Sequence, residues 1–355
     1  MALELKGVAK RVGVDMHIYP TDLTLAEEGF NILLGTTLAG KTTLMQLMAG
    51  LNRPTAGEIW FDGKNVTSEP VQARKVSMVH QQFINYPNFS VFENIASPLR
   101  VAGVGKDEIK QRVGSVAELL RLSPMLDRRP QQLSGGQQQR TALARALVKD
   151  ADLVLLDEPL ANLDYKLREE LRDEFPRLFA NRKCTVVYAT TEPSEALLIG
   201  GHTAALHEGR VTQFGLTGDS YRKPGDLRTA KVFSDPPMNT VSVHKVGDQV
   251  QLADGITWPA ADQLRGKPDG TYTLGIRPHH VTPLSHAPSS VSVKGKVLVT
   301  ELSGSESIVH FDFSGGTWVS QAHGIHAYDV GDEAEMFLDP ATAFYFDSED
   351  RLIAA

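Results

Sequence analysis

The first two-thirds of the chain alternate between short apolar runs and amphipathic stretches. Strand-like runs lie at residues 28–35, 74–81, 151–159 and 185–191. Apolar residues recur at helical spacing in residues 41–51 and 106–122. The run ADLVLLDEP (151–159) is continuously apolar, which is typical of a parallel strand buried on both faces. This alternation predicts an α/β fold built on a parallel sheet with right-handed crossovers.

The pattern changes near residue 234. SDPPMNT (234–240) is a proline-rich break, and short alternating runs follow it at 271–278, 291–300 and 306–313. Turns rich in Gly, Asp and Pro separate these runs, and no long helical pattern occurs among them. We therefore predict an α/β domain over residues 1–234 and a small all-β domain, a barrel or a sandwich, over residues 235–355.

Composition narrows the classes of protein. A chain of 355 residues is long enough for two cores, and a net charge of −7 argues against nucleic acid as the main partner. The single cysteine, Cys184, begins an apolar strand and cannot form an internal disulfide, so we expect a core residue in a reducing cytosol. No apolar run approaches the roughly 20 residues that cross a bilayer, and the N-terminus lacks the apolar core of a secretory signal. We expect a protein that neither spans a membrane nor is exported.

A phosphate-binding motif carries the strongest chemical signal. GTTLAGKTT (35–43) satisfies G-x-x-x-x-G-K-[ST] between a predicted strand and a predicted helix. Backbone N–H groups of such a loop, with the positive end of the following helix, bind phosphates. Lys41 would reach the β- and γ-phosphates of ATP, and the Thr42 hydroxyl would bind Mg²⁺. The expected phosphate-binding residues are Gly35, Thr36, Thr37, Leu38, Ala39, Gly40, Lys41, Thr42 and Thr43.

Two acidic residues end the apolar strand at 151–159. Asp157 lies where a carboxylate can hold Mg²⁺, and Glu158 can orient or deprotonate the attacking water. By itself, an Asp-Glu pair after an apolar run is more often a simple strand end. The phosphate loop favours the catalytic interpretation.

A second anion-binding helix start is expected at LSGGQQQR (133–140). Ser134, Gly135, Gly136 and Gln137 precede or begin a helical run, TALARALV. Taken alone, the sequence Ser-Gly-Gly would favour a simple helix cap over an anion-binding site. LSGGQ about 20 residues before LLDEP, in a chain with a phosphate loop, resembles the ATPase subunits of ABC transporters.

That resemblance implies a P-loop NTPase fold of the ABC type, with a helical subdomain. In this family, one subunit gives the phosphate loop and acidic pair of an ATP site, and the other subunit gives LSGGQ. LANLD (160–164) completes the set of motifs, and Asp164 matches the loop that contacts the partner subunit. Gln81 matches the glutamine that links Mg²⁺ and the attacking water to the membrane subunits, with Gln82 as its rival.

The resemblance extends to a branch of the family. RKVSMVHQQFINYPNFSVFENIASPLR (74–100) resembles the corresponding region of bacterial importers for maltose and related sugars or for glycerol phosphate. LGIRPHHV (274–281) and LDPATAFYFD (338–347) resemble the all-β, OB-like regulatory domain of those subunits. The segments QQFINYP (81–87) and ATTEP (189–193) are most similar to those of ATPase subunits of glycerol importers.

The chain departs from the family at two positions. The aromatic residue that stacks on adenine is replaced by Val12, with Tyr19 as the nearest other ring. The family histidine that contacts the γ-phosphate is replaced by Thr191, which can donate one hydrogen bond but carries no positive charge. Thr191 is alternatively a cap of the helix expected near Pro193. The site is thus expected to bind ATP but to be weakened for its hydrolysis.

The resemblance implies the cytosolic ATPase subunit of a bacterial importer for a small polyhydroxylated solute, peripheral to the inner membrane. Its implied partners are two membrane-spanning permease subunits and, indirectly, an external solute-binding protein. Because LSGGQ is intact while Thr191 weakens the chain's own site, a heterodimer with a different ATPase subunit is favoured, and a homodimer stays open. The alternatives are a nucleotide-gated subunit with little turnover and, disfavoured by the acidic charge, an ATPase acting on nucleic acid.

Overall fold

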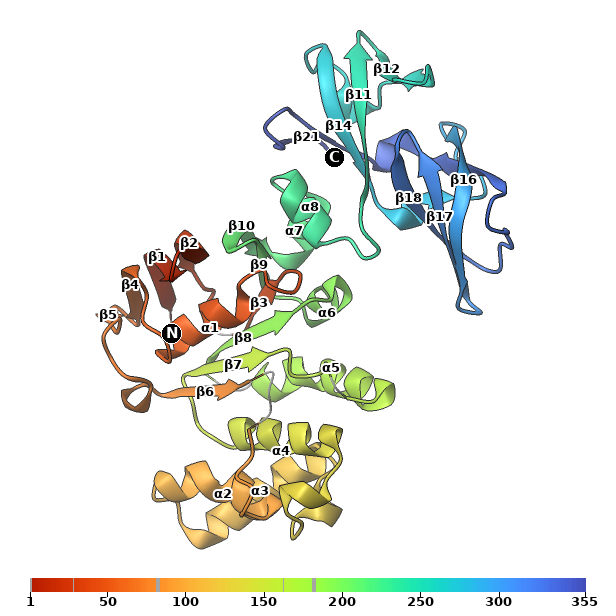
Figure 1. The fold of residues 1–355 in the computed structure, drawn as a ribbon. Helices are drawn as coiled ribbons and strands as arrows, with labels where there is room; N and C mark the ends of the chain where they lie inside the picture. Colours follow the sequence, from red (N-terminus) through yellow and green to blue (C-terminus); the bar gives the residue numbers. More distant parts are fainter. Residues whose placement is uncertain (1, 28, 81–83, 162, 181–182) are drawn as a thin grey trace. The chain divides into compact units, whose positions relative to one another are not determined.

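The computed structural model describes residues 2–27, 29–80, 84–161, 163–180 and 183–355. The chain divides into two compact units, Met1–Thr217 and Gly218–Ala355 (Figure 1). Each unit has its own apolar core.

A six-stranded sheet forms the centre of the first unit. Its order is β10 (Arg210–Leu216), β9 (His202–His207), β3 (Gly29–Leu34), β8 (Thr185–Thr190), β7 (Leu153–Asp157) and β6 (Val76–Val79). All neighbouring strands pair in parallel except β10 and β9. Every residue of β7 and β8 is buried, as the continuous apolar runs predict. The predicted parallel sheet is confirmed.

A second, antiparallel sheet was not predicted. It has the order β2 (Asp15–Thr24), β1 (Leu3–Val12), β4 (Ala56–Phe61) and β5 (Lys64–Asn65). Helix α1 (Lys41–Ala49) shares one apolar core with both sheets, through residues such as Leu5, Met45 and Leu155. The helix that follows the phosphate loop is therefore fixed on two sides.

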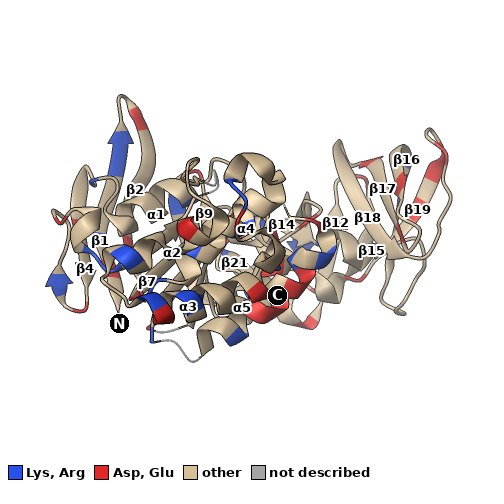
Figure 2. Ribbon diagram, turned by 90° about the horizontal axis from the view of Figure 1, so that it is seen from below, with Lys and Arg blue, Asp and Glu red and all other residues tan. Residues whose placement is uncertain are grey.

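The remaining helices of this unit were predicted in part, at Lys106, Gly135 and Pro193 but not at Val91 or Tyr165. They are α2 (Val91–Val101), α3 (Lys106–Leu119), α4 (Gly135–Leu147), α5 (Tyr165–Ala180) and α6 (Pro193–Ile199), with short 3₁₀ turns at Val71–Ala73, Ser123–Met125 and Pro130–Gln132. Helices α2, α3 and α4 pack together at one end of the unit, which confirms the helical subdomain (Figure 1). Helix α3 carries charges of both signs (Figure 2).

The second unit begins with two short helices and continues as strands. The helices are α7 (Thr217–Arg222) and α8 (Leu227–Val232). One sheet has the order β13 (Thr257–Pro259), β12 (Gln249–Leu252), β11 (Asn239–Val246), β14 (Gly270–Ile276), β20 (Phe344–Phe346) and β21 (Leu352–Ala354). The other has the order β15 (Val281–Thr282), β19 (Glu333–Leu338), β16 (Val291–Leu302), β17 (Glu306–Phe313) and β18 (Gly316–His323). Both sheets contribute to one core, and only 3₁₀ turns interrupt the strands described after residue 234.

The division between the units lies upstream of the domain boundary expected at residue 234. Thr217 is tied to the first unit, because its N–H donates to the Gly201 carbonyl at 3.0 Å and its hydroxyl lies 2.8 Å from that of Thr203. Helix α8 instead packs on the second unit, where Leu227 shares a small core with Phe346. The residue at which the first domain stops folding independently stays a prediction.

A chain cut after Thr217 is expected to unfold cooperatively and to bind ATP with the affinity of the full chain, because its core is closed. A chain cut at residue 234 should keep the same core but leave the apolar face of α8 without its partners. Urea unfolding followed by circular dichroism, together with ATP titration, compares the two. Cooperative unfolding of the longer chain alone would place the boundary at 234.

Candidate functional site

The phosphate loop joins β3 to α1 in the conformation that its sequence requires. Gly40 immediately precedes α1 with a φ of 102°, and a Cβ at this position would lie 2.8 Å from Ile18 Cδ1. Leu38 has a φ of 68°, a conformation that is uncommon for a residue with a large side chain, and its side chain is exposed. Because the loop ends at the start of α1, its N–H groups can face an anion.

Lys41 is the cation of the loop and is almost fully buried. Its Nζ donates to the carbonyl oxygens of Gly35 at 2.8 Å and Thr36 at 3.1 Å. It also forms an ion pair with Glu158 Oε1 at 3.3 Å. The phosphate-binding cation and the expected catalytic carboxylate are thus in contact. Glu158 adopts a φ of 48°, which is uncommon for a residue with a side chain.

Asp157 is a buried carboxylate beside the phosphate loop residue Thr42. It is 1% exposed, and neither carboxylate oxygen has a hydrogen bond of ordinary geometry to a described residue. Burial raises the pKa of the Asp157 carboxyl, and the nearby Thr42 hydroxyl partly offsets this shift. Buried charges are costly unless they are paired or bind a metal. The set of one carboxylate and one hydroxyl is suited to Mg²⁺, which prefers oxygen ligands.

A cavity of about 630 Å³ lies over the phosphate loop. It is lined by Met16, His17, Tyr19, Thr37, Leu38, Ala39, Gly40, Lys41, Thr42, Thr43, Glu158, Glu208 and Gly209. Val12, at the family position for adenine stacking, is not among these residues. Tyr19 is, and the Arg210 guanidinium lies 3.6 Å from the centre of its ring. Of the two candidate positions for adenine, the cavity favours Tyr19.

The LSGGQ segment begins α4 as predicted. The Ser134 hydroxyl accepts a hydrogen bond from the Gln137 N–H at 3.3 Å, and the Gln137 side chain accepts one from the Ser134 N–H at 3.0 Å. This reciprocal cap fixes the start of the helix, to which Gly135 and Gly136 belong. Ser134 does not line the cavity over the phosphate loop. Within one chain, LSGGQ therefore does not share the cavity of the phosphate loop.

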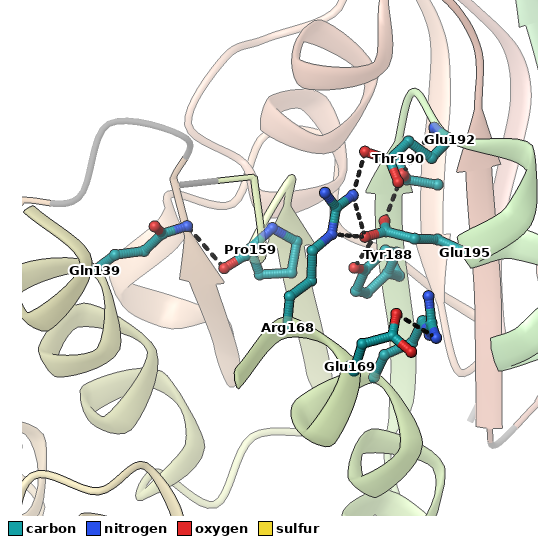
Figure 3. A network of polar contacts seen from close by, with 9 residues as sticks. Gln139, Pro159, Arg168, Glu169, Tyr188, Thr190, Glu192 and Glu195 are labelled. Atoms are coloured by element: carbon teal, nitrogen blue, oxygen red, sulfur yellow. Dashed lines mark hydrogen bonds and ion pairs between the residues drawn. The ribbon is translucent and has the colours of Figure 1, made fainter. Parts of the chain in front are cut away.

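A buried hydrogen bond connects α4 with the segment after the acidic pair. Gln139 is 3% exposed, and its Nε2 donates to the Pro159 carbonyl at 2.8 Å (Figure 3). Asp164, in the LANLD segment, caps α5 by accepting a hydrogen bond from the Leu167 N–H at 3.0 Å. Asp164 itself is exposed, which is compatible with the expected contact with a partner subunit.

Thr191 lies at the carboxyl end of β8, where the sequence placed it, but it does not cap the next helix. Helix α6 begins at Pro193 as expected, with Glu192 before it. The Thr190 hydroxyl, rather than that of Thr191, accepts a hydrogen bond from the Glu192 N–H at 3.0 Å. Thr191 is exposed, and no hydrogen bond joins its side chain to another described residue. The capping alternative is therefore wrong, because Glu192 is the residue that precedes the helix and no side chain in the described part of the chain accepts a capping hydrogen bond from the first turn of α6.

Three of the expected site segments gather at one edge of the central sheet. The phosphate loop, the acidic pair and the Thr190–Thr191 turn follow β3, β7 and β8, which are adjacent parallel strands. Gln81 and its rival Gln82 lie outside the described residues. Cys184 is buried just before β8, as expected.

The sequence missed two sets of contacts around these residues. One is the direct ion pair between Lys41 and Glu158. The other is a buried cluster around Glu195, which also includes Arg168, Tyr188 and Thr190 (Figure 3). Glu195 falls four residues after Thr191, but nothing in the local pattern pairs it with Arg168, which is 27 residues earlier.

Comparison with known proteins agrees with this geometry. An ABC transporter family model matches residues 19–161, and a TOBE domain model matches residues 274–346. The sn-glycerol-3-phosphate import ATP-binding protein UgpC of Yersinia enterocolitica is 35% identical over 99% of this chain and 98% of its own length. The chain belongs to the ABC transporter ATP-binding proteins. The Escherichia coli (strain UTI89) UgpC protein is 37% identical, over 90% of this chain and 88% of its own length.

A solved structure shares the fold of the first part of this ABC ATPase. It is the ATP-binding cassette MJ0796 in a dimeric, post-hydrolysis state with ADP and phosphate. It is 28% identical, with a TM-score of 0.56, and covers 61% of this chain and 98% of its own length. The predicted fold class, an ABC-type ATPase followed by an OB-like β domain, is confirmed, as is ATP as the ligand. No helix in the described part of the chain is long and apolar enough to cross a membrane.

Proposed function

We propose that this ABC ATPase energises the import of glycerol phosphate or a closely related polyhydroxylated solute. The observation that carries the proposal is the match over almost the whole chain to glycerol-3-phosphate import ATP-binding proteins. The complete set of phosphate loop, acidic pair and LSGGQ supports it. The narrower match to glycerol importers stays a prediction.

Mg²⁺ would be held by Asp157 and the Thr42 hydroxyl, with Gln81 as a further expected ligand. When bound, the metal neutralises charge on the β- and γ-phosphates. Neither Asp157 oxygen has a hydrogen bond of ordinary geometry to a described residue, which supports this assignment, because a bound cation compensates a carboxylate that burial otherwise disfavours.

Glu158 would orient and deprotonate the water that attacks the γ-phosphate of ATP. Its contact with Lys41 places it beside the phosphate loop. When ATP enters, Lys41 would exchange this carboxylate for phosphate oxygens, which leaves Glu158 ready to accept a proton. Thr191 would donate a hydrogen bond near the γ-phosphate, where the family has a charged group.

The ATP site would be completed by LSGGQ of a second subunit, with Asp164 at the contact. The dimeric state of the similar cassette MJ0796 supports a dimer. The UgpC relatives give no support to a different ATPase subunit as partner. Since this chain carries both halves of a site, two copies suffice, and we propose that the chain pairs with itself.

Attachment to a pair of permeases at the cytoplasmic face of the membrane would use the segment before α2. Ile84, Tyr86 and Phe89 expose large apolar side chains there, and the Tyr86 and Phe89 rings lie 5.3 Å apart. Large exposed apolar side chains in one segment are typical of a contact surface. A solute-binding protein would act through the permeases.

Thr191→His is expected to raise the ATPase rate by up to about tenfold, or about 1.4 kcal/mol. The imidazole offers a stronger donor near the γ-phosphate, and the Thr190 hydroxyl keeps its bond to Glu192. Thr191→Asn, which also adds a donor but no positive charge, is the matched control. Steady-state phosphate release measures all three proteins. An unchanged rate in Thr191→His would mean that another group holds the water.

The second candidate is a nucleotide-gated subunit with little turnover, which the exposed, neutral Thr191 favours. Uptake of radiolabelled sn-glycerol-3-phosphate into proteoliposomes that contain the permeases encoded beside the gene separates the two. Import that requires internal ATP and stops in Lys41→Ala supports the proposed function. ATP binding without import or phosphate release supports the second candidate.

A further inference from the structure

Glu195 is a buried carboxylate whose two oxygens are both fully used. It lies in the first turn of α6 and is 3% exposed. Its Oε1 accepts hydrogen bonds from Arg168 Nε at 3.1 Å and Nη2 at 2.9 Å (Figure 3). Its Oε2 accepts from the Tyr188 hydroxyl at 3.1 Å and the Thr190 hydroxyl at 2.6 Å. Four donors from two other elements thus converge on one side chain.

The donors come from two segments that matter for the ATP site. Arg168 lies in the first turn of α5, and its N–H donates to the Asp164 carbonyl at 2.9 Å, so it is tied to the end of LANLD. Thr190 is the last residue of β8 and directly precedes Thr191. Glu195 therefore joins the expected partner-contact loop to the turn expected beside the γ-phosphate.

The cluster has a defined charge. Arg168 also forms an ion pair with Glu192, which is partly exposed, so one guanidinium meets two carboxylates. Hydrogen bonds to Glu192 and Glu195 raise the pKa of Arg168 above its ordinary value, so Arg168 stays charged. Burial and the adjacent Glu195 raise the pKa of Tyr188, which therefore remains a neutral donor.

Because the Glu195 carboxylate accepts four hydrogen bonds, the side chains of this cluster have little conformational freedom. The Thr190 hydroxyl donates to Glu195 and accepts from the Glu192 N–H, so the turn that carries Thr191 is held from both sides. Displacing α5 would pull Arg168 away from both carboxylates. A movement of LANLD on contact with a second subunit would thus be passed to the turn at Thr191.

We propose that Glu195, with Arg168, is a positioning residue for ATP hydrolysis that couples the LANLD segment to the turn at Thr191. This inference rests on the proposed function, in which both segments act at an ATP site. The cluster is expected to affect the rate of ATP hydrolysis rather than the affinity for ATP, because none of its residues lines the cavity over the phosphate loop.

Glu195→Gln and Arg168→Lys test this assignment. Glutamine has the shape of Glu195, but its amide nitrogen cannot accept a hydrogen bond. The variant therefore loses either the bonds from Arg168 or those from Tyr188 and Thr190. Lysine keeps the charge of Arg168 but cannot present two parallel N–H groups to Glu195. For both variants we expect kcat for ATP to fall about tenfold, while KM changes less than about twofold.

Arg74→Lys is the matched control. Arg74 is also a partly buried arginine, and it donates to the main-chain carbonyls of Glu69 and Met48, away from the site. Arg74→Lys should lower the urea midpoint without lowering kcat.

The outcomes separate positioning from simple stabilisation. A fall in kcat for Arg168→Lys beyond that of Arg74→Lys, at equal loss of stability, supports the inference, and this comparison suffices if Glu195→Gln does not fold. Equal kcat values in the parent, Arg168→Lys and Arg74→Lys would overturn it while the proposed function stands. A parent protein without ATP turnover would overturn the proposed function and this inference together.

Discussion

Glu158→Gln is expected to abolish ATP turnover and to leave ATP binding intact. Glutamine fills the same space but cannot accept a proton from the attacking water. Loss of general-base catalysis typically lowers a rate by about 10²- to 10⁴-fold. The substitution also removes the ion pair with Lys41, so the lysine is freed for phosphate oxygens. ATP should therefore accumulate in the site.

The trapped state is expected to be a dimer. With ATP held between one phosphate loop and the partner's LSGGQ, Glu158→Gln should elute as a dimer in size-exclusion chromatography at millimolar ATP. Glu301→Gln is the control, since Glu301 lies in β16 of the second unit and its side chain is 64% exposed. Phosphate release at the parent rate from Glu158→Gln would remove this carboxylate from the mechanism.

Asp157→Asn is expected to lower turnover and raise stability together. The loss of one Mg²⁺ ligand should reduce phosphate release by about a hundredfold or more, because metal stabilisation of charge is worth several kcal/mol. In the absence of Mg²⁺, the free energy of unfolding should rise, because a buried carboxylate without partners becomes a neutral amide.

The stability effect has a defined pH dependence. Burial raises the pKa of folded Asp157, so the folded state binds the proton more tightly than the unfolded chain does. This group therefore lowers the stability of the parent as pH rises through that pKa, and Asp157→Asn should show no such loss. Urea unfolding at pH 4, near the pKa of about 3.9 of an unfolded Asp, and at pH 8, both without Mg²⁺, measures the difference. If the free energy of unfolding depended equally on pH in both proteins, the assignment of Asp157 as an uncompensated buried charge would be contradicted.

Features set by local sequence could be predicted. Strands β7 and β8 were found because their sequences are almost continuously apolar, and the structure buries every residue in them. The phosphate loop was found because its glycines and lysine must stand at fixed spacing to bind phosphate.

Features set by distant contacts could not be predicted. The pairing of β1 with β2 has three register shifts, so neither strand shows the strict alternation that marks a strand in sequence. The sequence offered Thr191 as one possible cap of α6, whereas the helix begins after Glu192 without a capping side chain, and an offset of one residue lies beyond pattern analysis. The Arg168–Glu195 contact arises only when α5 packs beside α6.

ATP hydrolysis by a mixed pair of variants tests most directly whether two copies of this chain build a shared ATPase site. Lys41→Ala removes the phosphate-binding cation but keeps LSGGQ, and Ser134→Arg blocks LSGGQ but keeps the phosphate loop. Each variant alone should be inactive. An equal mixture should recover about one quarter of the parent rate, because half of the randomly paired dimers are mixed and each of these holds one complete site. A mixture no more active than its separate components would contradict a site shared between two copies.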